Sequence, residues 1–283
     1  LPSEPPMIDP VQLTAELVRI PSCDPPGGEL AVAQVVARAL RQAGISTEID
    51  EFQPGRANVI GRIPGRGEKP ALVMSAHLDT VPAGELPWSF APFAGDIVGG
   101  RVRGRGASDM KSAVAAFVAA ADRLNRRQAP LAGDVILAFT AGESANCLGA
   151  RHLVSQGFQK EIGAFLCGEP STLDLIVVEK AILWLEAEAR GEMGHVSGAR
   201  GVNAIEVMAD AILALRGLSL NLPGHHLLSP PSVSVGRIMG GTAVNVTPDR
   251  CTAEVDVRFG PGIDPAEAID QIAAVLPPRV SLR

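Results

Sequence analysis

Apolar residues recur with helical spacing near the start of the chain, over residues 10–18 and 29–43. In the second stretch one helix face carries four apolar residues, Val32, Val35, Val36 and Leu40. Short apolar runs bounded by Gly, Pro or Asp then predict strands at residues 57–63, 71–76, 135–140 and 164–167. Helices are predicted between them, over residues 110–126 and 149–156. Strands that alternate with helices predict an α/β sheet with helices on both faces.

The pattern changes after residue 178. Residues 182–189 alternate apolar and acidic positions, as a half-exposed strand does. A helix, two strands, a helix and a short strand are then predicted, over residues 203–216, 232–239, 251–259, 265–275 and 279–282. This order is typical of a small α+β module with an antiparallel sheet. We therefore predict two domains, residues 1–178 and 179–283.

Composition restricts the class of protein and its possible partners only slightly. The 283 residues are 46% hydrophobic and carry a net charge of -6, which describes a globular chain with a large core. An acidic balance without runs of like charge argues against nucleic acid or an anionic membrane as a partner. No apolar segment approaches the roughly 20 residues that span a bilayer, and the N-terminus lacks the pattern of a signal peptide. We therefore expect a cytoplasmic protein.

The predicted strands of the first domain end in residues that can bind a metal ion. His77 and Asp79 close one strand, Glu143 and Glu169 follow two others, and Asp109 precedes the alanine-rich helix. In such sheets, ligands bind beyond the carboxyl ends of the strands, so these side chains are expected to lie close together. A neutral imidazole and carboxylates are the donors that catalytic metal sites use. The sequence therefore predicts a hydrolytic metal centre at this edge.

Simpler explanations exist for the same residues. Asp109 could serve only as the N-cap of the helix that follows it. Glu143 and Glu169 could be exposed loop acids. Convergence of four separate segments on one edge favours a site over these alternatives.

Several motifs in a fixed order resemble one family, the di-zinc amidohydrolases and exopeptidases that include acetylornithine deacetylase, succinyl-diaminopimelate desuccinylase, aminoacylase and carboxypeptidase G. They cover residues 75–80, 88–93, 104–111, 140–150, 168–171, 201–205 and 240–258. The resemblance implies an α/β catalytic domain with a mixed sheet and an inserted α+β lid or dimerisation domain. It also implies hydrolysis of an amide bond, by N-deacylation or exopeptidase action, in a small amino-acid-like substrate with a free carboxylate.

The resemblance also assigns roles in the first domain. It implies that His77 and Glu169 bind the first zinc ion and that Asp109 bridges two ions. Asp79 would hydrogen-bond the other nitrogen of His77 and fix its tautomer. Glu143 would be the general base that takes a proton from water and passes it to the leaving amine.

Two departures from the family affect the second metal ion. Ser144 stands where the family has a second glutamate, and the chain stops at Arg283, before the family's C-terminal histidine and the rest of its catalytic domain. We therefore expect an incomplete catalytic domain that binds one or two zinc ions, with cobalt or manganese as alternatives. The alternative function is a truncated or non-catalytic relative that binds one metal ion and dimerises without turnover.

In the second domain the resemblance implies contacts with substrate and with a partner subunit. His195 would reach the partner subunit's active site and steady the oxyanion, whereas Asn245 and Arg258 would hold the substrate's carboxylate. The chain would then act as a homodimer through this domain. As alternatives, His195 could be a solvated loop residue, and Arg258 could pair with Asp256 or Glu254 on the strand surface.

Overall fold

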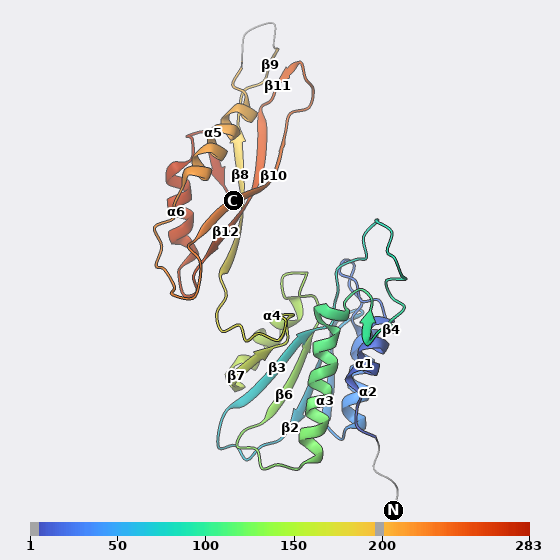
Figure 1. Cartoon of the computed structure of the whole chain (residues 1–283). Coiled ribbons are helices and arrows are strands. Elements are labelled where there is room, and N and C mark those ends of the chain that lie inside the picture. The colour runs from blue at the N-terminus through green and yellow to red at the C-terminus, as the bar shows by residue number, and fades with distance from the viewer. Residues whose placement is uncertain (1–5, 196–200) are drawn as a thin grey trace, which may run out of the picture. The chain divides into compact units, whose positions relative to one another are not determined.

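The computed structural model describes residues 6–195 and 201–283 and, for His195, only the backbone. The chain divides into two compact units, Leu1–Leu173 and Asp174–Arg283 (Figure 1). The predicted boundary, between residues 178 and 179, lies a few residues further on, in the segment that leads into the second unit. Within the described residues, no helix combines the length and the apolar character that a bilayer span requires.

The first unit contains a five-stranded mixed sheet with the order β1-β2-β6-β3-β7. Its strands are β1 (Ser46–Gln53), β2 (Arg56–Ile63), β3 (Ala71–His77), β6 (Val135–Thr140) and β7 (Ile162–Cys167). Strand β3 runs parallel to both β6 and β7, with His77 opposite Thr140 and Ser75 opposite Cys167. The carboxyl ends of these three strands therefore reach the same edge of the sheet.

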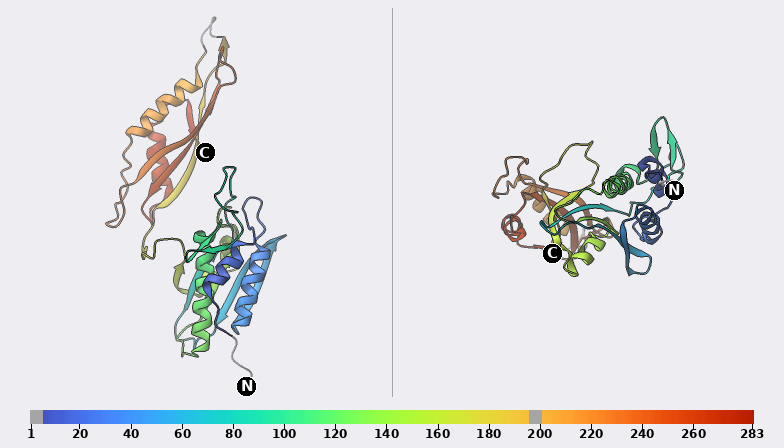
Figure 2. Two further views of the ribbon diagram at one scale, coloured as in Figure 1. Left: turned by 45° about the vertical axis from the view of Figure 1, so that its right-hand side comes forward. Right: turned by 90° about the horizontal axis from the view of Figure 1, so that it is seen from below.

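Helices cover both faces of this sheet, as predicted (Figure 2). Helices α1 (Pro10–Val18), α2 (Leu30–Gln42) and α3 (Ser112–Arg126) lie on one face, and α4 (Leu148–Ser155) with the short helix η2 (Phe158–Glu161) lies on the other. All six residues of β6 are buried because the strand contributes to both apolar cores. A strand covered on both sides has no solvent face, so β6 is a continuous apolar run in the sequence.

Several elements of this unit differ from the prediction. Strand β1 was not predicted because it is an edge strand with a polar sequence. A small hairpin of β4 (Asp96–Val98) and β5 (Arg101–Arg103) was also missed. The predicted helix over 110–126 begins instead at Ser112, after an irregular turn, η1 (Ala107–Lys111), in which Asp109 has extended backbone angles. The N-cap position of α3 is Lys111, so the interpretation of Asp109 as a cap is wrong.

The second unit is an α+β module built on a four-stranded antiparallel sheet with the order β10-β12-β8-β13. Its strands are β8 (Ala181–Arg190), β10 (Ser232–Gly240), β12 (Arg250–Phe259) and β13 (Val280–Leu282). Helices α5 (Ala204–Gly217) and α6 (Pro265–Val275) pack on one face through a single apolar core. A short pair, β9 (Gly194–His195) and β11 (Val246–Thr247), was not predicted. The main elements follow the predicted order.

Candidate active site

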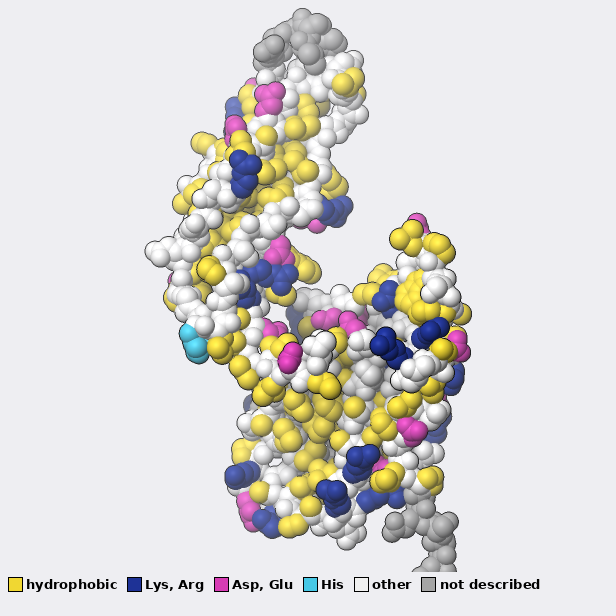
Figure 3. Space-filling view, viewed as in Figure 1, with side chains coloured by type: hydrophobic (Ala, Val, Ile, Leu, Met, Phe, Trp, Pro, Cys, Tyr) yellow, Lys and Arg dark blue, Asp and Glu magenta, His cyan; other side chains and the backbone are white. Residues whose placement is uncertain are grey.

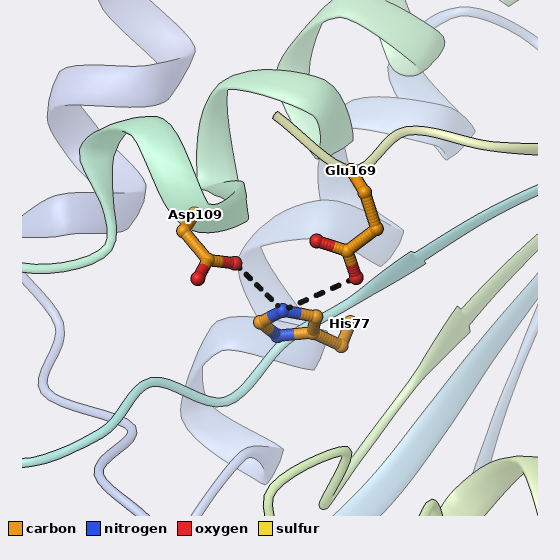
Figure 4. A group of neighbouring side chains, drawn as sticks. All are labelled: His77, Asp109 and Glu169. Carbon is orange, nitrogen blue, oxygen red and sulfur yellow. Dashed lines mark hydrogen bonds and ion pairs between the residues drawn. The ribbon is translucent and has the colours of Figure 1, made fainter. Parts of the chain in front are cut away.

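His77 lies at the carboxyl end of β3, with its ring buried and its two nitrogens in different environments (Figure 4). Nδ1 lies 2.9 Å from the backbone carbonyl oxygen of Asp79. Because a carbonyl oxygen only accepts, Nδ1 carries a proton, and Nε2 is the nitrogen that a metal ion would bind. That nitrogen lies 3.0 Å from Asp109 Oδ1 and 3.8 Å from Glu169 Oε1. This nitrogen and the two carboxylate oxygens therefore face one another, as the ligands of a single metal ion do.

These three side chains have the donor chemistry and spacing of a metal site. One ligand atom from each lies within 4.8 Å of the other two, and among the described residues this is the one such group of three or more His, Cys, Asp or Glu side chains. They come from the end of β3, from η1 and from the segment after β7. The carboxylate side chains of Asp109 and Glu169 are 64% and 45% exposed. One imidazole and two carboxylates on an open site fit a zinc-type ion that keeps a free position.

Asp79 is fully buried directly behind this group. Its carboxylate accepts hydrogen bonds from the backbone N–H groups of Glu143 and Ser144, at 3.0 and 3.1 Å, and from the Ser144 hydroxyl at 3.1 Å. The carboxylate Oδ1 lies 3.6 Å from His77 Nδ1, so the hydrogen bond predicted between the two residues is made by the Asp79 main chain instead. Asp79 therefore connects the histidine to the segment that carries Glu143.

Glu143 lies on a loop, residues 141–147, that joins β6 to α4, and Asn58 bridges the start of this loop and the first turn of α4. The buried Asn58 side chain accepts from the Ala141 N–H at 3.0 Å and donates to the Gly149 carbonyl at 3.1 Å. A Cβ atom on Gly149 would lie 2.2 Å from Asn58 Oδ1, so glycine is required there. Asn58 was not among the predicted site residues; its signal in the sequence is a polar residue inside the apolar run 57–63.

A buried ion cluster supports the other side of this loop. Arg56 on β2 donates to Glu29 at 2.6 and 3.1 Å and to Asp24 at 2.7 Å. The hydrogen bond to Glu29 raises the pKa of Arg56 above its ordinary value despite burial. Gly142, with φ of +66°, packs so closely that a Cβ atom there would lie 2.6 Å from Arg56 Nη2. This cluster was not predicted either, because Arg56 is distant from Asp24 and Glu29 along the chain.

The site is strongly acidic. On the face shown in Figure 3, Asp and Glu side chains gather at the edge of the first unit where the strands end. The pKa of the Cys147 thiol is raised by desolvation and then by the negative charges of Glu143 and Asp79. A negative potential of this kind attracts a cation to the group formed by His77, Asp109 and Glu169.

Lys111, two residues after Asp109, is a fully buried cation. Its ammonium group donates to the carbonyl oxygen of Leu17, in the last turn of α1, at 2.9 Å and to that of Ile20, just after the helix, at 2.7 Å. Burial lowers the pKa of Lys111 from 10.5 to about 8, against smaller opposing effects of Cys23 and Asp79. The side chain therefore anchors η1 to α1, and the free-energy cost of burying its charge depends on pH.

We expect Lys111→Met to change how stability depends on pH. Between pH 8 and 10.5 the folded protein has lost the Lys111 proton while the unfolded chain keeps it, so the wild type gains stability as pH rises. The free energy of unfolding of the wild type minus that of the variant should increase by about 2 kcal/mol between pH 7 and pH 10. Urea denaturation at both pH values measures this difference. A difference that stays constant would contradict the assignment.

The remaining predicted site residues lie in the second unit. Asn245 is exposed in the loop between β10 and β11. Arg258 on β12 makes two hydrogen bonds to Asp256, at 2.6 and 2.8 Å, whereas Glu254 pairs with Arg237. Arg258 thus makes one of the two ion pairs considered as alternatives. The backbone of His195 pairs with Val246, but its side chain lies outside the described residues.

The structure therefore brings four of the predicted residues into direct contact or close approach: His77, Asp79, Asp109 and Glu169. The main chain of Glu143 joins them through Asp79. A mixed α/β sheet whose parallel strands end at an imidazole and several carboxylates is the architecture of a metallohydrolase.

The chain belongs to peptidase family M20/M25/M40, which matches residues 73–276. Succinyl-diaminopimelate desuccinylase of Rhodospirillum centenum is 33% identical over 264 residues, which are 89% of this chain and 68% of that protein. Acetylornithine deacetylase of Vibrio atlanticus is 34% identical over 245 residues, 83% of this chain and 63% of that protein. The predicted family is therefore confirmed, and the chain spans about two thirds of the length of these relatives.

Solved structures show the same fold. The M20 family metallo-carboxypeptidase of Sulfolobus solfataricus superposes with a TM-score of 0.74 at 17% identity, covering 98% of this chain and 78% of that one. A dinuclear metal-binding M20 peptidase of Bacillus subtilis gives a TM-score of 0.67 at 20% identity, covering 97% and 72%. The predicted fold class, a mixed sheet between helices together with an α+β module, agrees with these neighbours.

Proposed function

We propose that this chain is a metal-dependent hydrolase that cleaves the amide bond of a small N-acyl amino acid or dipeptide with a free carboxylate. The observation that carries the proposal is the grouping of His77 Nε2 with the carboxylates of Asp109 and Glu169, whose ligand atoms lie within 4.8 Å of one another. Relatives named as a desuccinylase and a deacetylase support an acylated amino acid as the substrate class.

His77, Asp109 and Glu169 would together hold one ion, which we propose to be zinc, with cobalt or manganese as substitutes. When bound, such an ion polarises a carbonyl group and makes water more acidic. The Ser144 hydroxyl donates to Asp79, and this bond orients it toward that buried carboxylate. We therefore propose a centre with a single ion rather than a pair.

Glu143 is the proposed general base. Its side chain is exposed on the loop, while its backbone N–H is held by Asp79. The carboxylate would accept a proton from the attacking water and deliver it to the leaving amine nitrogen. Asp79 would fix both the base and, through its main-chain carbonyl, the tautomer of His77.

The roles proposed for the second unit rest on the family resemblance. Arg258 and Asn245 would bind the substrate's carboxylate, and His195 would stabilise the oxyanion in a partner subunit. The unit would then act as a lid and as the contact of a homodimer.

Metal titration combined with a hydrolysis panel tests the proposed function. Calorimetry with zinc should give about one ion per chain, and His77→Ala should abolish that binding. N-acetyl and N-succinyl amino acids and dipeptides should be hydrolysed with zinc and not with excess chelator. If zinc binds but no member of the panel is cleaved above the background of Glu143→Ala, the chain is a non-catalytic metal-binding relative and the proposal fails.

A further inference from the structure

The sheet of the second unit has one open face. Helices α5 and α6 cover the other face, which carries the buried apolar residues of β8 and β12. On the open face lie two neighbouring rows of residues, and each row runs across the strands from β10 through β12 to β8. They consist of Ser232, Arg258 and Ile182, and of Ser234, Asp256 and Trp184. Trp184 is 75% exposed and Ile182 is 56% exposed.

Asp256 holds two of these side chains in fixed positions. Its carboxylate accepts from Arg258 Nε and Nη2, at 2.6 and 2.8 Å, and from Trp184 Nε1 at 2.8 Å. The hydrogen bonds from Arg258 and then Trp184 keep the pKa of Asp256 below its ordinary value, so the carboxylate remains charged at neutral pH. The guanidinium and the indole are thereby oriented by one common acceptor.

Arg258 keeps a second edge for binding. A guanidinium carries five N–H donors, and the edge formed by Nε and Nη2 is occupied by Asp256. Within the described part of the chain, Arg258 Nη1 has no hydrogen-bond partner. The edge formed by Nη1 and Nη2 can therefore donate two parallel hydrogen bonds to a second carboxylate.

Two exposed apolar residues of β8 lie beside Arg258 and Asp256 on this face of the sheet. The indole N–H of Trp184 is used by Asp256, so its ring presents a flat apolar surface rather than a polar one. Ile182 lies directly opposite Arg258 across the strands. A charged donor beside an exposed aromatic ring and an aliphatic side chain matches a ligand that has a carboxylate next to an apolar group.

We propose that Trp184, Asp256 and Arg258 form a recognition surface for amino acid ligands with apolar side chains, in which Asp256 positions the arginine and Trp184 with Ile182 selects the side chain. This proposal rests on the proposed function, because it takes Arg258 as the residue that binds the substrate's carboxylate. It adds a positioning role for Asp256 and a selectivity role for Trp184.

The two tryptophans of the chain allow a direct test by fluorescence. In the full chain carrying Trp88→Phe, Trp184 is the sole reporter. Chelator-treated protein is titrated with N-acetyl-leucine, N-acetyl-leucinamide and N-acetyl-glycine, and calorimetry checks each affinity. We expect saturable binding of N-acetyl-leucine that changes the emission, no binding of the amide, and affinity for N-acetyl-glycine about tenfold weaker.

Variants separate the positioning role of Asp256 from the selectivity role of Trp184. Asp256→Asn should weaken N-acetyl-leucine binding by about tenfold, because the arginine loses its charged anchor. Glu254 lies on the same strand as Asp256 and pairs with Arg237 on β10, so Glu254→Gln removes a neighbouring ion pair and should leave affinity unchanged. Trp184→Ala, measured by calorimetry, should remove the preference for leucine over glycine and retain the preference for acid over amide.

Equal binding of acid and amide, absence of binding, or unchanged selectivity in Trp184→Ala would overturn the proposal. None of these readouts depends on metal or turnover. Hydrolysis of the substrate panel together with unchanged selectivity would therefore reject the recognition surface alone. Selective binding without hydrolysis would reject the proposed enzyme and leave the surface in place.

Discussion

Glu143→Gln is expected to lower the turnover of N-acyl amino acids by about 100- to 10,000-fold, the usual contribution of a general base. Glutamine keeps the shape of the side chain but cannot accept a proton. The hydrogen bond that secures this residue comes from its backbone N–H to Asp79 and survives the substitution. Metal affinity and the fold should therefore stay close to those of the wild type.

Initial rates with saturating zinc, together with zinc titrations, measure this effect. Glu85→Gln is the matched control, because Glu85 is also an exposed acid of the first unit but lies outside the site. Its rate should equal that of the wild type. A rate for Glu143→Gln within a few-fold of the wild type would show that another group moves the proton.

Arg56→Met is expected to lower the free energy of unfolding by about 3–5 kcal/mol, the typical cost of leaving buried charges without a partner. The side chain of Glu29 is fully buried and that of Asp24 nearly so, and both carboxylates depend on Arg56. Methionine fills part of the volume but donates no hydrogen bond. The close packing of Gly142 against the guanidinium extends the damage to the loop that carries Glu143.

Urea denaturation at pH 7 measures this loss, with Arg62→Met as the control. Arg62 lies on the same strand and also pairs with two acids, Asp134 and Glu161, both at 2.6 Å. Its side chain is 37% exposed, compared with 12% for Arg56. Solvent weakens such pairs, so about 1 kcal/mol or less should be lost. Similar losses of unfolding free energy in both variants would contradict the argument that burial makes the ion pairs of Arg56 more important than those of Arg62.

Local patterns in the sequence were sufficient for the main elements. Strand β6 and helix α6 match their predicted bounds because apolar spacing and flanking Gly, Pro or Asp residues mark them within a short window. The candidate site was also visible in this way. His77, Glu143 and Glu169 stand at or just after the ends of apolar runs, and in a parallel sheet those ends meet at one edge.

Tertiary structure decided what depends on partners far along the chain. Strand β1 exists because β2 pairs with it, not because of its own polar sequence. Asn58 closes the loop of Glu143 across a separation of 83 residues, and Arg56 joins acids from another loop. No short stretch of the sequence contains both members of such a pair.

The same reason explains the details of the site. The sequence by itself determined which residue types stand at the strand ends, and with them the family and the class of chemistry. Only the folded chain decided that the Asp79 carbonyl, rather than its carboxylate, accepts the hydrogen bond from His77 Nδ1. Likewise, only the fold decided that Arg258 bonds Asp256 and leaves Glu254 to Arg237. Hydrogen bonds depend on differences of a few tenths of an ångström, which spacing along a sequence does not encode.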